Sequence, residues 1–171
     1  ILEISDENNS PWHYSQSSSG ADTVLKIGSP SQTYNAQKAF VIKYRVTGAI
    51  LYLDNHDELF WNAVGTEWDA PINKVSVNLH LPAPIKRELL STAVYSGKFG
   101  SRSHNVETQV VDESNISFRG GRYMPYEGLT IAAGWPKGIV EIVSQKDSSA
   151  YQYSGSDYPR ALPSGGAQGH S

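Results

Sequence analysis

Apolar and polar residues alternate along much of the chain with the period of two that is typical of β-strands. Phe40, Ile42, Tyr44 and Val46 alternate with Ala, Val, Lys and Arg, and residues 75–81 alternate between apolar and polar side chains. Because successive side chains of a strand point to opposite faces, each pattern predicts a strand with one buried face. Further strands are expected at residues 1–5, 23–27, 49–53, 92–95, 106–111, 116–119, 129–133 and 139–143.

Glycine, proline, asparagine and serine separate these segments at short intervals, as turn residues do. Many short strands with regular turn signals predict an all-β fold, a β-sandwich of the immunoglobulin-like or jelly-roll-like type. Helix is expected only as short turns, at residues 57–63 and 85–90. Residues 1–143 are predicted to form this domain, and the Ser/Gly/Pro-rich residues 144–171 are predicted to form a tail or linker.

Composition limits the function more than it defines it. The chain has 14 basic and 17 acidic residues and a net charge of −3, which argues against nucleic acid as a partner. The absence of cysteine excludes disulfides, zinc–thiolate sites and thiol nucleophiles within these residues. No nucleophile elbow and no phosphate-binding glycine loop is present. We therefore expect no enzyme, no catalytic residue and no cofactor.

The segment 51–72 is unusual because it is both acidic and aromatic. Asp54, Asp57 and Glu58 supply the carboxylate oxygens that a calcium ion prefers, which makes them a weak candidate metal site. Their spacing does not fit an EF-hand loop. The alternative interpretation is a solvated turn whose aspartates cap a short helix at residues 58–61.

The same segment allows a carbohydrate cleft as a second interpretation. Glu67 and Asp69 point the same way on an extended segment, and paired carboxylates hydrolyse glycosides when they face each other across a sugar. Trp61 and Trp68 would then be stacking platforms. The competing interpretation is that the aromatic residues fill one end of a sandwich core.

The order of several short motifs resembles the YciQ-like family of predicted bacterial membrane proteins of unknown function. The similarity extends over about residues 38–140. The motifs are Tyr44-Arg45-Val46, Asp57-Glu58-Leu59-Phe60-Trp61-Asn62, Gly65, Trp68 and Pro71-Ile72, then Val75–Pro82, Tyr95–Gly100, Pro125–Thr130 and Trp135–Gly138. The matched positions that we take as a binding or structural motif are Asp57, Glu58, Trp61, Asn62, Gly65 and Trp68.

The resemblance implies a membrane-anchored protein with an extracytoplasmic β-rich domain and no established activity. It favours a binding or assembly module over the carbohydrate domain and over a calcium-stabilised adhesion-type domain. Its expected partner is another membrane or envelope protein, or the protein's own transmembrane region. The family's first strands are not found before Ile1, so an open sheet edge for self-association is expected. Within the motif, Asn62 is expected to hydrogen-bond a buried loop and Gly65 to adopt a positive φ.

Overall fold

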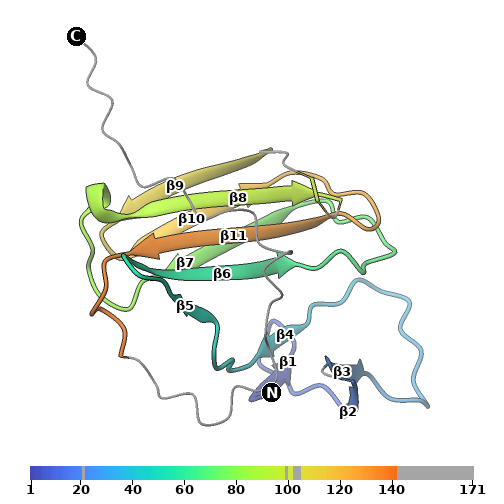
Figure 1. The fold of residues 1–171 in the computed structure, drawn as a ribbon. Helices are drawn as coiled ribbons and strands as arrows, with labels where there is room; N and C mark the ends of the chain where they lie inside the picture. The colour runs from blue at the N-terminus through green and yellow to red at the C-terminus, as the bar shows by residue number, and fades with distance from the viewer. Residues whose placement is uncertain (21, 99, 102–104, 142–171) are drawn as a thin grey trace. The chain divides into compact units, whose positions relative to one another are not determined.

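A computed structural model describes residues 1–20, 22–98, 100–101 and 105–141, and these residues form an all-β structure (Figure 1). The one helical element among them is a 3-10 turn, η1, at Arg87–Leu89. The strands are β1 (Glu3–Ser5), β2 (Tyr14–Ser19), β3 (Asp22–Ile27), β4 (Val41–Lys43), β5 (Ile50–Tyr52), β6 (Asp57–Val64), β7 (Val75–His80), β8 (Ser91–Gly97), β9 (Val106–Asp112), β10 (Asn115–Gly120) and β11 (Gly128–Trp135).

The described residues form two compact units, unit 1 at residues 1–47 and unit 2 at residues 48–141. The predicted domain over residues 1–143 is thus built as two units, divided between Thr47 and Gly48. Its predicted boundary with the tail lies outside the described residues, as do residues 144–171.

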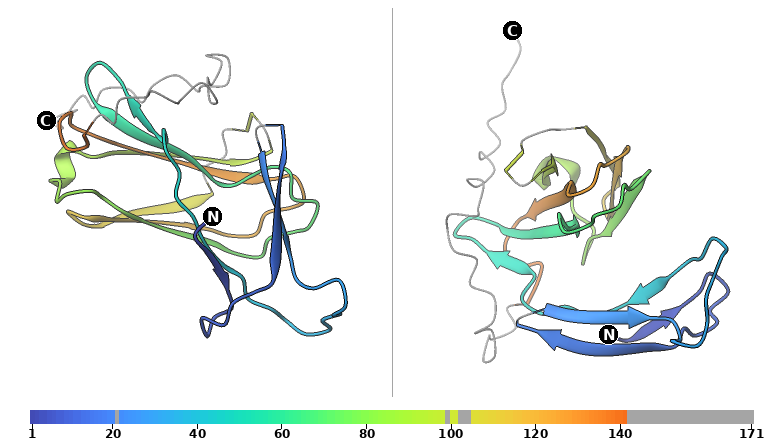
Figure 2. Two further views of the ribbon diagram at one scale, coloured as in Figure 1. Left: turned by 90° about the horizontal axis from the view of Figure 1, so that it is seen from below. Right: turned by 90° about the vertical axis from the view of Figure 1, so that its right-hand side faces the viewer.

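Unit 2 is a β-sandwich of two antiparallel sheets, which Figures 1 and 2 show as two layers. One sheet has the order β5-β6-β11-β8 and the other the order β7-β10-β9. The core between the sheets takes side chains from both, and Phe118, Ile116, Leu129 and Ile131 have at most 2% of their surface exposed. Burial of each such side chain stabilises the fold by about 1.5–3 kcal/mol.

The central strand β11 divides its side chains strictly between two faces. Leu129, Ile131, Ala133 and Trp135 belong to the core cluster. The residues between them are small, so the opposite face of β11 is lined with glycine, threonine and alanine. On that face Glu58 of β6 and Ser91 of β8 lie on either side of Gly134, and Phe60 and Ala93 lie on either side of Ala132.

Several sequence predictions are confirmed in unit 2. Strand β7 covers most of the segment expected at residues 75–81, with Val77 and Leu79 packed on the core and Asn78 exposed. The helical turn expected at residues 85–90 is present as η1. Ile139–Glu141 forms no strand, contrary to expectation, and residues 142 and 143 of that prediction lie outside the described residues.

The helical turn expected at residues 57–63 is wrong, because this segment is strand β6. Its residues pair with β11 from Asp57 to Val64, and with β5 from Asp57 to Leu59. The ladder provides the backbone groups of β6 with partners along most of its length. Tertiary pairing therefore outweighs the local preference of Asp and Asn for caps and turns.

Unit 1 consists of two small antiparallel pairs, β1–β4 and β2–β3. Trp12 contacts Tyr34 and Phe40 at ring-centroid distances of 5.4 and 5.0 Å. The buried face predicted for residues 40–46 is wrong. The strand is limited to Val41–Lys43, and the four alternating apolar side chains are 39–51% exposed.

Candidate functional site

The acidic pair at the start of β6 is buried, and its two carboxylates are separated by the strand itself. Asp57 and Glu58 are each 2% exposed. Because they are consecutive residues of one strand, their side chains leave on opposite faces. The solvated turn considered for this segment is therefore wrong, and the two carboxylates do not converge.

Asp57 pairs with a lysine from the segment after β11. Asp57 lies opposite Trp135 in the ladder, and Lys137 Nζ is 3.3 Å from Asp57 Oδ1. The Lys137 ammonium also donates a hydrogen bond to the Leu53 carbonyl oxygen. The pair thus ties the β5–β6 turn to the end of β11, which is a structural task.

Glu58 lies on the other face, beside His56, Ser91 and Gly134. His56 Nε2 is 3.7 Å from Glu58 Oε2, a charge contact longer than a hydrogen bond. Burial raises the pKa of Glu58 above its ordinary value, and the His56 charge partly offsets this. A Cβ on Gly134 would lie 2.5 Å from Ser91 Oγ and 3.0 Å from the His56 ring, so only glycine fits beneath this group.

This histidine is poorly placed to activate the serine beside it. His56 Nδ1 is 2.6 Å from Asn55 Oδ1, while Nε2 faces the Glu58 carboxylate. A general base needs a ring nitrogen aimed at the proton that it removes. Both nitrogens of His56 face other oxygen atoms, so the geometry does not favour an activated Ser91.

We expect the buried Glu58 carboxyl to make the stability of unit 2 depend on pH. The unfolded chain releases this proton near the ordinary pKa of 4.5, and the folded chain releases it at a higher pH. Unfolding between these values therefore releases a proton, and stability falls as pH rises through this range. Urea unfolding of Glu58→Gln should show a flatter pH profile above 4.5. Glu67→Gln, at an exposed carboxylate, should keep the wild-type profile.

The other motif residues have different surroundings. Trp61 is half-buried against the core, whereas Trp68 is 57% exposed in the β6–β7 loop. The two rings therefore do not make one stacking face. Asn62 is exposed and accepts a hydrogen bond from Thr130 Oγ1 on the neighbouring strand, not from a buried loop. Gly65 is not among the glycines with positive φ, so the conformation predicted for it is wrong.

The carboxylates of the two alternative interpretations are also placed differently. Glu67 and Asp69 are both exposed, as is Asp54, while Asp57 and Glu58 are buried. Within the described part of the chain, no three His, Cys, Asp or Glu side chains lie close enough together to hold a metal ion.

One end of unit 2 carries three exposed, large apolar side chains, and only Trp68 among them was a candidate from the sequence. Trp68, Met124 and Tyr126 are 57%, 53% and 57% exposed, and we call them the loop cluster. The Tyr126 N–H donates to the Trp68 carbonyl oxygen at 2.7 Å, and this joins the β6–β7 and β10–β11 loops. Tyr126 has φ +65°, a region that bulky residues rarely occupy. The loops thus hold an aromatic side chain outward at the cost of backbone strain.

Relief of this strain is a testable consequence. Tyr126→Gly should be about 1 kcal/mol more stable than Tyr126→Ala, because glycine adopts positive φ without a Cβ clash. Both variants lack the ring and keep the backbone N–H that bonds Trp68. Their comparison in urea unfolding therefore isolates the backbone term. Equal stability of the two variants would contradict a strained Tyr126.

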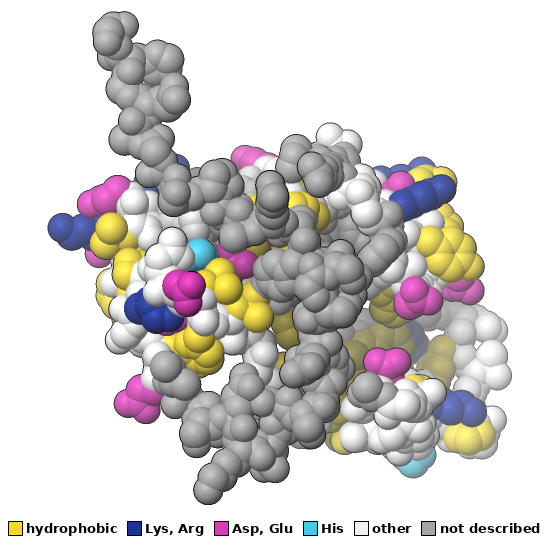
Figure 3. Space-filling model, viewed as in Figure 1, with side chains coloured by type: hydrophobic (Ala, Val, Ile, Leu, Met, Phe, Trp, Pro, Cys, Tyr) yellow, Lys and Arg dark blue, Asp and Glu magenta, His cyan; other side chains and the backbone are white. Residues whose placement is uncertain are grey.

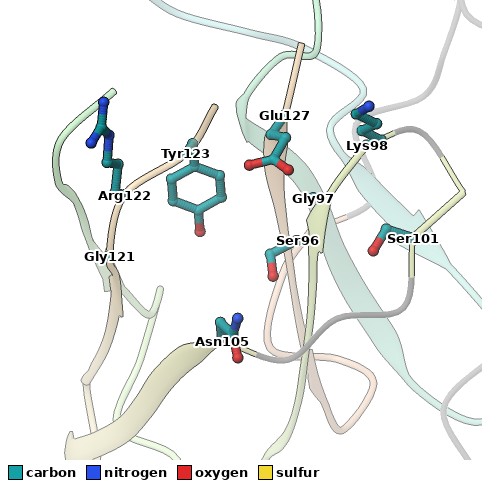
Figure 4. A pocket seen from close by; sticks show the side chains of 9 residues that line it. All are labelled: Ser96, Gly97, Lys98, Ser101, Asn105, Gly121, Arg122, Tyr123 and Glu127. Atoms are coloured by element: carbon teal, nitrogen blue, oxygen red, sulfur yellow. The ribbon is translucent and has the colours of Figure 1, made fainter. Parts of the chain in front are cut away.

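A polar cavity of about 430 Å³ lies at the same end, between the β8–β9 and β10–β11 connections (Figure 4). In Figure 4 the Tyr123 hydroxyl points toward the space that Ser96 and Asn105 also face. Ser101 and Glu127 complete its polar lining, and the exposed cations Lys98 and Arg122 stand at its rim.

A family model covers most of the chain. The family model described as "Predicted membrane protein (DUF2207) N-terminal domain" matches residues 2–135, which include all eleven described strands. No curated protein and no solved structure matches the chain. Among the described residues, no helix has the length and apolar composition that crossing a bilayer requires.

Proposed function

Because the chain belongs to the DUF2207 family of predicted membrane proteins, we propose that it is an extracytoplasmic, non-catalytic binding or assembly module of a bacterial membrane protein. The motif order supports the narrower assignment to YciQ-like proteins. The partner that we propose is another membrane or envelope protein. A contact with the protein's own transmembrane region is the alternative outcome of the test below.

The loop cluster is the observation that carries this proposal. Exposed Trp and Tyr side chains are costly to leave in water and are the residues that most often anchor protein interfaces. A backbone hydrogen bond from Tyr126 to Trp68 also joins the two loops that carry these side chains. The positive φ of Tyr126 costs folding free energy, and residues with such strained backbones are typical of functional positions.

The charge distribution supports a protein partner over nucleic acid. The net charge is −3, and Figure 3 shows basic side chains scattered among acidic and apolar ones on the visible face. A nucleic-acid surface needs basic residues gathered on one face. The non-catalytic part of the proposal is supported by the buried, mutually facing arrangement of His56 and Glu58.

Cysteine labelling tests the side of the membrane. This chain has no cysteine, so a single cysteine at the exposed Leu89 gives a unique thiol within it. The full-length protein, with any cysteine outside this chain replaced, is labelled in intact cells with a membrane-impermeant maleimide. Labelling without cell lysis supports the extracytoplasmic assignment. Labelling that requires lysis would contradict it.

Site-specific crosslinking tests the binding surface. A photoreactive phenylalanine is placed at Trp68 or Tyr126 in the membrane-bound protein, with Leu89 as an equally exposed control. A crosslinked second protein at positions 68 and 126, absent at 89, is the expected result. A product of twice the protein's own mass would indicate self-association. Identical crosslinking patterns at all three positions would contradict the loop cluster as the binding surface.

The matched substitution is Trp68→Ala. Since the side chain is mostly in solvent, we expect a change in unfolding free energy within about 0.5 kcal/mol. The crosslink from position 126 should nevertheless weaken, because the neighbouring anchor is lost. Loss of folding in Trp68→Ala would mean that this ring has a structural role instead.

A further inference from the structure

We propose that the tyrosine-rich segment after Glu141 packs on the outer face of the sheet β5-β6-β11-β8, the face that points away from the core of unit 2. The segment lies beyond the family match, which ends at residue 135, so the family assignment does not account for this contact. The contact does not involve the loop cluster and does not depend on the partner proposed above.

Two aromatic side chains lie on this outer face. Phe60 is opposite Ala132 in the ladder of β6 and β11, and Tyr95 is opposite Thr130 in the ladder of β8 and β11. The alternate residues of β11 belong to the core cluster, so Ala132 and Thr130 point away from the core. Strands on either side of a third strand are about 10 Å apart. The Phe60 and Tyr95 ring centroids are only 6.1 Å apart, so the two rings lean toward each other over β11.

The outer face of the other sheet has a different composition. Its side chains are polar or charged, and they include Ser76, Asn78, His80, Glu107, Gln109, Ser117 and Arg119. A sheet that faces water on one side has such a polar face. The face with Phe60 and Tyr95 instead also carries Leu51, and all three side chains are half-buried although no described strand of unit 2 packs on them. We therefore expect another segment to cover this face.

The described chain ends beside this sheet. The Glu141 carbonyl oxygen accepts a hydrogen bond of 3.2 Å from the Tyr52 hydroxyl, and Tyr52 belongs to β5, the edge strand next to β6 (Figure 1). Neighbouring strands lie about 4.8 Å apart, so the distance from β5 across the sheet to β8 is about 14 Å. The chain from Glu141 to Tyr151 can extend over as much as about 33 Å, so the residues that follow can reach Phe60 and Tyr95.

The segment after Glu141 has the side chains that suit an aromatic face. Three of the ten tyrosines of the chain lie within residues 151–158, with Asp157 as the one charged residue among them. Tyrosine combines a large apolar ring with a hydroxyl group, and it is enriched in protein interfaces. The low charge of this stretch lets it cover apolar rings without burying unpaired charges. Residues 151–158 are therefore the part that we assign to the Phe60–Tyr95 pair.

Paramagnetic relaxation in the full chain tests this contact. The chain has no cysteine, so Ser156→Cys provides one attachment site for a nitroxide spin label within residues 151–158. The label should broaden the ¹⁵N-detected amide signals of β6, β11 and β8 more than those of β7, β10 and β9, because stacked sheets lie about 10 Å apart. Equal broadening of the two sheets, or stronger broadening of β7, β10 and β9, would overturn the proposal.

A mixed sample separates docking within one chain from docking between copies. Spin-labelled chain without ¹⁵N is mixed with ¹⁵N-labelled chain that carries no spin label. We expect no broadening of β6, β11 and β8 in this mixture. Broadening as strong as in the singly labelled chain would assign the face to a second copy and would overturn docking of the chain's own segment.

Removal of the two rings tests whether they make the contact. In the spin-labelled chain, the double variant Phe60→Thr, Tyr95→Thr should reduce the broadening of β6, β11 and β8 to the level of the other sheet, while threonine keeps a high strand propensity. Each single variant should reduce it in part, and this result decides the question if the double variant does not fold. The control Val111→Thr replaces a 55% exposed side chain of β9 and should leave the broadening unchanged. Unchanged broadening in folded variants that lack the rings would contradict the assignment.

Discussion

Replacement of Lys137 by Met is expected to lower the unfolding free energy of unit 2 by about 3 kcal/mol. The substitution leaves the Asp57 carboxylate, 2% exposed, without the ammonium that lies 3.3 Å from its Oδ1. Removal of one partner from a buried ion pair typically costs about 3–5 kcal/mol, because the remaining charge is uncompensated. We place the effect at the lower end since the Lys137 side chain is 42% exposed.

The chain offers a matched control for this prediction. Lys43 pairs with Glu3 in unit 1 at 2.8 Å, a shorter distance, but both side chains are exposed, at 53% and 41%. Water screens such a pair, so Lys43→Met should cost much less than Lys137→Met. We thus predict that the burial of the charges, and not the distance between them, decides which ion pair contributes more to the free energy of unfolding.

Urea unfolding followed by tryptophan fluorescence measures both variants. Trp12 is the one tryptophan in residues 1–47, whereas three lie in residues 48–141, so a Trp12→Phe background isolates the signal of unit 2 and its difference from the unmodified background reports unit 1. The double variant Asp57→Asn, Lys137→Met should recover part of the loss, because no buried charge remains. Equal losses for Lys137→Met and Lys43→Met would contradict a buried, stabilising role for Asp57.

The strands that the sequence predicted well are those in which one face is apolar and the other polar. Val75, Val77 and Leu79 alternate with polar residues, and β7 has that face on the core. Strand β6 was not predicted, because Asp57 and Glu58 at its start are typical of the capped end of a helical turn. The lysine that compensates Asp57 is known only from the fold, since Lys137 is 80 residues away along the chain.

The candidate site was predictable only in part, for a related reason. Trp68 was recognised because tryptophan is conspicuous in any sequence. Tyr126 was not, because its role depends on a φ angle and on loops that meet only in the folded unit. The pattern over residues 40–46 predicted a buried face that is exposed in the structure. Alternation shows which face of a strand is apolar but not whether another element covers that face.

Two glycines that nearly touch each other should respond to alanine in opposite ways. A Cβ on Gly128 would lie 2.5 Å from the Val64 carbonyl oxygen and 3.1 Å from the Thr66 methyl group. The first contact is with the backbone of β6, which cannot rotate away as a side chain can. Gly128→Ala should therefore lower the unfolding free energy by about 2 kcal/mol, a typical cost of overpacking.

Gly65 provides the control, at a position that the sequence motif marked as equally special. A Cβ there meets no atom within 4 Å, and Gly65 has no positive φ. Gly65→Ala should be neutral or should stabilise by about 0.4–1 kcal/mol, because alanine reduces the entropy of the unfolded chain. Urea unfolding of the two variants tests whether the loss of stability follows the close packing at Gly128 or the presence of Gly65 in the sequence motif. A larger loss at Gly65 than at Gly128 would show that the β6–β11 junction is packed differently from the structure described.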